Sequence, residues 1–169
     1  ERKKVARTVG IGAVKYADLS TERTKDYVFD WERMLSFDGN TAPYLQYAYA
    51  RICSIFRKWG GERESLRENF ESLLEDELSI LSNEELTLSR RLVEFPTIMD
   101  ESISTFSPHK LCKHLHSVAS SFASFYENCS ILKEENAMLS KRRLALCDLT
   151  ARELQLGLGI MGIDVPERM

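Results

Sequence analysis

The chain has 169 residues, 43% of them hydrophobic and 29% charged, a balance typical of a soluble globular domain with a core of its own. No apolar run approaches the length of a membrane span, and the start, Glu1-Arg-Lys-Lys-Val, has no signal region and no initiator Met. We therefore expect no membrane partner and interpret the chain as part of a longer one. The net charge of −3 excludes a protein that is basic throughout, so any nucleic acid must be bound by local patches.

The first forty residues combine one helix with a less regular segment. Residues 2 to about 17 favour a helix, although Gly10 and Gly12 weaken it. Turn-forming residues follow over 20–40. Between them, residues 27–31 (Tyr-Val-Phe-Asp-Trp) alternate partly between apolar and polar, which predicts a short strand or an extended segment packed on another element.

A second helix is predicted to start at Thr41. Thr is a good N-cap, and Pro43 stands in the first turn, where its missing N–H costs nothing. We expect this helix to run to about Lys58 and to end at Gly60-Gly61, because Gly readily adopts the conformation that follows a helix.

Charged residues dominate the next stretch. We expect 62–79 to be helical and interpret the acidic run from Glu71 to Glu85 as a solvated face that points away from any phosphate. Ser82-Asn-Glu-Glu85 is a capping box that opens a helix reaching Glu94. Phe95-Pro96 ends that helix and begins a short one.

Two long helices complete the chain. The first opens at Ser107-Pro108, and its apolar positions form one wide stripe. These positions are Leu111, Cys112, Leu115, Val118, Ala119, Phe122, Phe125, Tyr126 and Cys129. Residues 130–139 are polar and are expected to form a loop or a frayed helix end. The second long helix begins near Ser140 and ends before Gly162. It is apolar nearly all round, which predicts a central place. The fold class predicted is all-α, an antiparallel helical bundle.

No catalytic or metal-binding constellation is visible in the sequence. Gly10-Ile-Gly12 lacks the third Gly and the preceding strand of a phosphate loop. The three histidines, His109, His114 and His116, do not share one helical face, so we expect neither a metal site nor an acid–base cluster. The cysteines contain no CxxC pair, and we interpret them as reduced core thiols. They are Cys53, Cys112, Cys129 and Cys147.

One segment has the composition of an interaction surface. On a helix, Tyr44, Tyr47 and Arg51 share one face. A second, largely apolar face is formed by Leu45, Tyr49, Ile52 and Phe56. Tyrosine rings stack on unpaired bases and Arg reaches phosphates or base edges, so the first face suits RNA. The alternative is that these tyrosines belong to the core, with their hydroxyls at its rim.

Around this segment the sequence resembles arginyl-tRNA synthetases. The resemblance rests on FDGNTAPYLQYAYAR at 37–51, on KYADLS at 15–20 and FDWERML at 29–35, and on the ending GIMGIDVPERM at 159–169. It extends over essentially the whole chain and implies a class I aminoacyl-tRNA synthetase, which uses ATP to attach arginine to tRNA. The HIGH-like and KMSKS-like motifs of such enzymes are absent from the sequence, so these residues are expected to bind no cofactor and to be inactive alone.

The resemblance also implies a division of the chain and a set of site residues. Residues 1–40 would be the end of the catalytic domain, and 41–169 a helical anticodon-binding domain. The residues implied near the anticodon loop are Tyr44, Tyr47, Arg51, Arg57, Tyr126 and Met169. Arg57 lies off the face of Tyr47 on an ideal helix, so its contact depends on its long side chain. Some members have a Trp four residues after the Tyr that matches Tyr126, where this chain has Ser130.

The partners implied are tRNA(Arg) and the enzyme's own catalytic domain, in the cytoplasm, with an organellar form as the alternative. All arginine codons have G in the middle, so we expect a pocket for the middle cytosine of the anticodon, with tyrosine stacking and salt-dependent phosphate contacts. A second hypothesis is a helical protein–protein docking module of a synthetase complex, which would use exposed apolar surface and need no tRNA.

Overall fold

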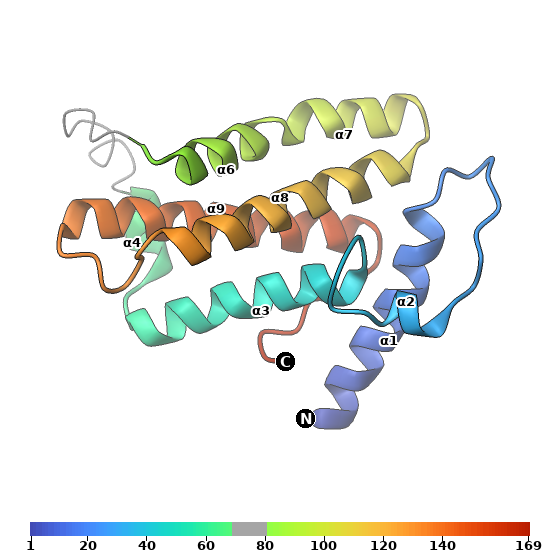
Figure 1. Ribbon diagram of the computed structural model, residues 1–169, viewed down its shortest axis with the longest axis horizontal. Helices are drawn as coiled ribbons and strands as arrows, with labels where there is room; N and C mark the ends of the chain where they lie inside the picture. Colours follow the sequence, from blue (N-terminus) through green and yellow to red (C-terminus); the bar gives the residue numbers. More distant parts are fainter. Residues whose placement is uncertain (69–80) are drawn as a thin grey trace.

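The computed structural model describes residues 1–68 and 81–169, and all regular structure in these residues is helical. Figure 1 shows the helices in chain order. They are α1 Arg2–Leu19, α2 Trp31–Met34, α3 Ala42–Trp59, α4 Arg63–Glu68, α6 Asn83–Val93, α7 Phe95–Ser104, α8 Pro108–Asn128 and α9 Ala137–Ile160. The predicted all-α fold is confirmed.

The long helices α3, α8 and α9 lie side by side at the centre of the bundle, and α9 runs antiparallel to α3 and α8, which run in the same direction (Figure 1). Helices α6 and α7 cover α8, and α4 packs against α9. Helix α1 crosses one end of the bundle, where it contacts α3 and α8. The Tyr16 hydroxyl fixes this crossing because it donates to the carbonyl of Cys112 in α8 at 2.9 Å.

The helix ends follow the local chemistry predicted from the sequence. The Thr41 hydroxyl accepts the N–H of Tyr44 at the start of α3, and Gly60 ends the helix with a positive φ of 73°. Ser82 and Glu85 form the complete capping box of α6. These termini set the lengths of the helices that carry the candidate site.

The core is formed by the facing stripes of α3, α8 and α9. Its fully buried members include Leu45, Ile52, Leu115, Phe122, Leu144, Leu154 and Leu158. At Gly157, helices α9 and α8 approach so closely that a Cβ would lie 2.7 Å from the Leu115 side chain. All four cysteines are buried and free, which confirms the interpretation of them as core thiols.

Two expectations about secondary structure need correction. Residues 27–30 have no regular structure, so the strand alternative was wrong, and the segment turns helical at Trp31 because Asp30 caps α2 by accepting the N–H of Arg33. Helix α9 begins at Ala137, three residues earlier than predicted, because Asn136 accepts the N–H groups of the first turn.

The central place predicted for α9 agrees with its contacts with α3, α6 and α8, although Leu149, Leu156 and Ile160 are exposed. One expectation about burial was wrong. The acidic run is not solvated at Glu85, whose side chain is 1% exposed because it caps α6 and pairs with Arg143. The part of that run over 71–80, and of the predicted helix over 69–79, lies outside the described residues.

Candidate nucleic-acid interface

Three of the predicted site residues meet where α3 and α8 lie side by side. The Arg51 guanidinium donates to the Tyr47 hydroxyl at 2.7 Å, and its Cζ lies 4.8 Å from the Tyr47 ring centroid. The same Cζ lies 5.0 Å from the ring centroid of Tyr126, on α8. Cation–π attraction at these distances orders all three side chains. Arg51 therefore links two tyrosines that are 79 residues apart in sequence.

Each of the two tyrosine rings packs against another aromatic ring on one side and is open to solvent on the other. Tyr47 is 41% exposed and meets Phe37 edge-on, with centroids 6.1 Å apart. Tyr126 is 37% exposed and packs on the fully buried Phe122 at the same distance. A half-exposed ring fixed by its inner edge is a preformed platform for an unpaired base.

These side chains border a groove of about 760 Å³, a volume within the range of ligand clefts. Its basic side chains come from three parts of the chain: Arg51, Arg57, Lys58, Lys133 and Arg168. Among the described residues that line it, none is acidic. The groove is therefore a local site for an anion in a chain of net charge −3.

The C-terminal tail closes one side of this groove. Arg57 donates from Nη1 to the carbonyl of Glu167 at 3.0 Å, and Gln46 donates to the carbonyl of Asp164 at 2.8 Å. Gln46 is fully buried, so the tail is anchored to α3 from inside the bundle. This anchoring places the terminal Met169, which is exposed, in the groove beside Arg57.

Tyr44 is the one predicted site residue that the structure leaves outside the groove. It is partly buried against the hydrophobic core, and its ring centroid lies 5.5 Å from that of His116 on α8. Tyr44 and Tyr47 thus share a helix without sharing a surface, because the first turn of α3 is covered by the N-terminal half of α8. The alternative that these tyrosines belong to the core therefore fits Tyr44 better than Tyr47.

The segment that follows α8 also contributes to the groove, with Cys129, Ser130, Ile131, Leu132 and Lys133. The sequence had marked Cys129 only as part of an apolar stripe and Ser130 only through the Trp that some family members have there. No local pattern marks the other three residues, because they reach the groove only when α8 and α9 are packed together.

Outside the groove, His114, Glu153 and Cys112 are buried titratable residues that belong to the packed interior. His114 Nε2 lies 2.7 Å from Oε1 of Glu153, and both side chains are buried between α8 and α9. Burial raises the pKa of the Cys112 thiol to about 12, so it is not a nucleophile near neutral pH. Within residues 1–68 and 81–169, no three His, Cys, Asp or Glu side chains converge to hold a metal ion.

Comparison with known proteins assigns the class of this chain. Residues 45–169 match the model of the DALR anticodon binding domain. Residues 1–31 match the model of the class I (R) tRNA synthetase catalytic domain. The chain therefore belongs to the DALR anticodon-binding domain family. Along the described stretches, no helix has the length and hydropathy needed to cross a membrane.

The relatives identify the kind of enzyme in which this domain occurs. The chain is 51% identical to the arginine–tRNA ligase of Cellvibrio japonicus, over 98% of the chain and 27% of the relative. The arginyl-tRNA synthetase structure from Thermus thermophilus matches with a TM-score of 0.86 and 30% identity, over 100% of the chain and 28% of that protein. The arginyl-tRNA synthetase structure from Plasmodium falciparum matches with a TM-score of 0.82 and 32% identity, over 98% of the chain and 28% of that protein. The resemblance drawn from the sequence is confirmed, and the chain spans little more than a quarter of its relatives' length.

Proposed function

We propose that this chain is the anticodon-binding part of an arginine–tRNA ligase and that the groove beside Tyr47, Arg51 and Tyr126 binds the anticodon loop of tRNA(Arg). The observation that carries the proposal is the combination in one groove of two half-exposed tyrosine rings and five basic side chains. Rings bind unpaired bases by stacking, and cations bind the flanking phosphates. An anticodon loop presents both features in the same few nucleotides.

The tyrosine pair would hold the middle nucleotide, because cytosine is the one anticodon base common to all arginine tRNAs at that position. A base inserted beside Arg51 has a π-face on Tyr47 or Tyr126 and a cation close to its edge. Arg57, Lys58 and Lys133 would face the phosphates of the loop. Met169 would contact the base from the tail side of the groove.

The parent enzyme would activate arginine with ATP in a part of the catalytic domain that precedes this chain. Residues 1–40 are proposed as the end of that domain and 41–169 as the anticodon-binding domain. The family matches, at 1–31 and 45–169, fall on either side of this boundary. ATP is therefore expected to have no site in these residues, and arginylation to require the whole enzyme.

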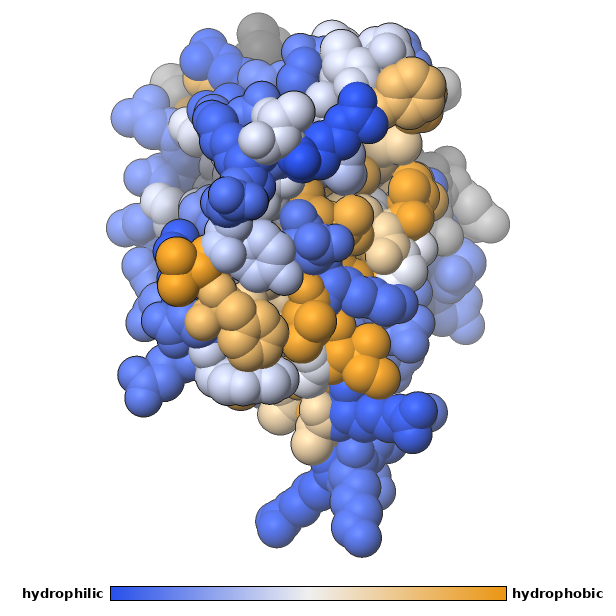
Figure 2. Space-filling view, turned by 90° about the vertical axis from the view of Figure 1, so that its right-hand side faces the viewer, coloured by the Kyte–Doolittle hydropathy of each residue, from blue (hydrophilic) through white to orange (hydrophobic). Residues whose placement is uncertain are grey.

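The catalytic domain is also the proposed partner of an exposed apolar surface. Figure 2 shows apolar side chains gathered on the face of the molecule that contains α1 and the segment after it. Exposed members of residues 1–40 include Ile11, Val14, Tyr27, Val28, Phe29 and Trp31. An apolar patch of this kind is rarely left open to water. The match of these residues to a catalytic-domain model favours the rest of that domain as its cover.

Binding to tRNA transcripts tests the function. We expect the chain to bind a tRNA(Arg) transcript more tightly than the same transcript with its middle anticodon C changed to G, and to lose affinity as salt rises. Equal binding to both transcripts would contradict anticodon reading. An affinity for tRNA that does not change with salt concentration would argue against phosphate contacts and favour a surface that docks proteins.

A further inference from the structure

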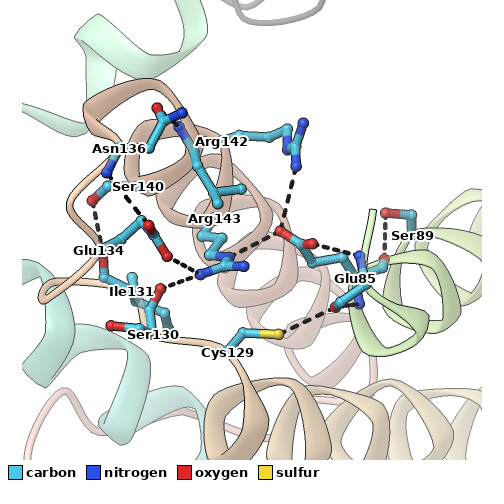
Figure 3. Close-up of polar contacts among 12 residues, drawn as sticks. Glu85, Ser89, Cys129, Ser130, Ile131, Glu134, Asn136, Ser140, Arg142 and Arg143 are labelled. Atoms are coloured by element: carbon cyan, nitrogen blue, oxygen red, sulfur yellow. Dashed lines mark hydrogen bonds and ion pairs between the residues drawn. The ribbon is translucent and has the colours of Figure 1, made fainter. Parts of the chain in front are cut away.

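The loop that follows α8 is held by an ion network buried between α6 and α9. Figure 3 shows Arg143 of α9 at its centre. Its Nε lies 3.0 Å from Oε1 of Glu85, and its Nη1 donates to the Ser130 carbonyl at 2.6 Å and to the Glu134 carboxylate at 2.7 Å. One guanidinium nitrogen therefore joins the beginning and the end of residues 130–134.

Further hydrogen bonds fix the same segment. The Ser140 hydroxyl donates to the Ile131 carbonyl at 2.7 Å (Figure 3). Cys129 Sγ lies 3.3 Å from the Ser82 hydroxyl. Glu134 also accepts the backbone N–H of Asn136, which caps α9. The main chain at 130 and 131 is thus bonded to side chains of α9, while the opposite side of residues 129–133 lines the groove.

The network is poorly explained as a source of stability alone. The Arg143 side chain is 11% exposed and that of Glu85 1%, and burying such a pair costs desolvation energy that its attraction often only offsets. Burial acts to raise the pKa of Glu85, but the Ser82 N–H and the Arg143 guanidinium outweigh it and leave the pKa lowered. Both charges therefore persist at neutral pH. What the charged pair supplies, and an apolar pair of the same volume cannot, is a guanidinium aimed at the loop.

We propose that Arg143, oriented by Glu85 and clamping the loop through Glu134, is a positioning residue of the groove: it holds residues 129–133 in the conformation that receives the anticodon loop. This proposal rests on the proposed function of the groove. It assigns the polar segment after α8 a role in recognition, although neither Arg143 nor Glu134 lines the groove.

Glu134→Ala tests the clamp, because the change in tRNA affinity expected from losing the clamp is opposite to the change expected from charge alone. Removing an acidic residue near a basic groove should by charge alone strengthen tRNA binding. Loss of the clamp should weaken it instead, because the loop must then be ordered when the tRNA binds. The matched control is Glu135→Ala, which removes the same charge from the neighbouring exposed residue. Glu135 takes part in none of the bonds that Glu134 and Arg143 make.

We expect Glu134→Ala to bind the tRNA(Arg) transcript about tenfold more weakly than Glu135→Ala, equivalent to about 1.4 kcal/mol. The two variants should have similar melting temperatures, since Glu134→Ala leaves the buried Glu85–Arg143 pair intact. Amide hydrogen exchange over 130–134 should rise in Glu134→Ala only. The double variant Glu85→Gln, Arg143→Met removes the charged pair, keeps a capping-box residue and should weaken binding similarly.

Equal affinities of Glu134→Ala and Glu135→Ala, with unchanged exchange over 130–134, would overturn this proposal. The proposed function would then survive, provided that the unchanged chain prefers the tRNA(Arg) transcript to the one with a G in the middle. Loss of that preference in the unchanged chain would instead refute the proposed function and this proposal with it.

Discussion

Replacing Tyr47 with Ala separates the two interpretations of the tyrosines on α3. Its ring is 41% exposed and borders the groove, so its loss should remove one base stack, worth about 1–3 kcal/mol, or roughly 5- to 150-fold in affinity for tRNA(Arg). Little stability should be lost, because much of the ring is already in water. Tyr47→Phe keeps the ring, loses only the Arg51 hydrogen bond and should retain most of the affinity.

Tyr44→Ala is the matched control, since it removes the same side chain three residues earlier on the same helix. Tyr44 packs on the core and lies outside the groove. Its loss should lower the free energy of unfolding by about 1–2 kcal/mol, less than the ~3–5 kcal/mol of a fully buried aromatic, and leave the affinity nearly unchanged. The assays are urea unfolding and fluorescence-detected tRNA binding. If Tyr44→Ala weakens binding as much as Tyr47→Ala does, the assignment of the groove is wrong.

Three further predictions concern charge, pH and packing. Lys133→Ala should weaken tRNA binding and reduce the slope of log affinity against log salt by about 1, and an unchanged slope would remove Lys133 from the phosphate contacts. The lowered pKa of Glu85 means that its stabilising charge is present above its ordinary value of 4.5 and lost as the pH falls through its folded value. Urea unfolding of the unchanged chain should therefore depend more on pH below about 4.5 than that of the Glu85→Gln, Arg143→Met variant, and equal pH profiles would contradict the shift. Gly157→Ala should destabilise the fold by about 1–3 kcal/mol, because the new Cβ would lie 2.7 Å from the Leu115 side chain. Gly159→Ala is the control: its Cβ would meet open space, so the substitution should stabilise the fold by about 0.5–1 kcal/mol. Equal melting temperatures of the two variants would contradict this packing.

Local sequence signals predicted the helices well where capping chemistry was strong. Thr41 with Pro43, Gly60, and Ser82 with Glu85 mark ends that the structure reproduces. Asn136 was missed because its neighbours are polar, and a polar run does not distinguish a loop from the first turn of a helix. The apolar residues all round α9 predicted its central place. Which of them are exposed could not be predicted, because periodicity gives the apolar faces of a helix and not the number of partners that cover them.

The candidate site was only partly predictable for a different reason. Helical spacing paired Tyr47 with Arg51, and the family resemblance added Tyr126, Arg57 and Met169, all of which border one groove. Spacing also grouped Tyr44 with them, although contact with α8 removes it from that surface. The wall formed by residues 129–133 depends on bonds to α9, which no pattern within α8 or its loop encodes.

A two-by-two comparison of protein and RNA tests most directly whether the groove reads the middle anticodon base. The unchanged chain and Tyr47→Ala would each be titrated with the tRNA(Arg) transcript and with its middle C-to-G counterpart at one fixed salt concentration. We predict that the unchanged chain discriminates between the transcripts by at least about 1 kcal/mol, the cost of one wrong base, and that Tyr47→Ala loses most of this discrimination. If Tyr47→Ala lowers the affinity for both transcripts by the same factor, the ring contributes to affinity without contacting the middle base, and the central claim is contradicted.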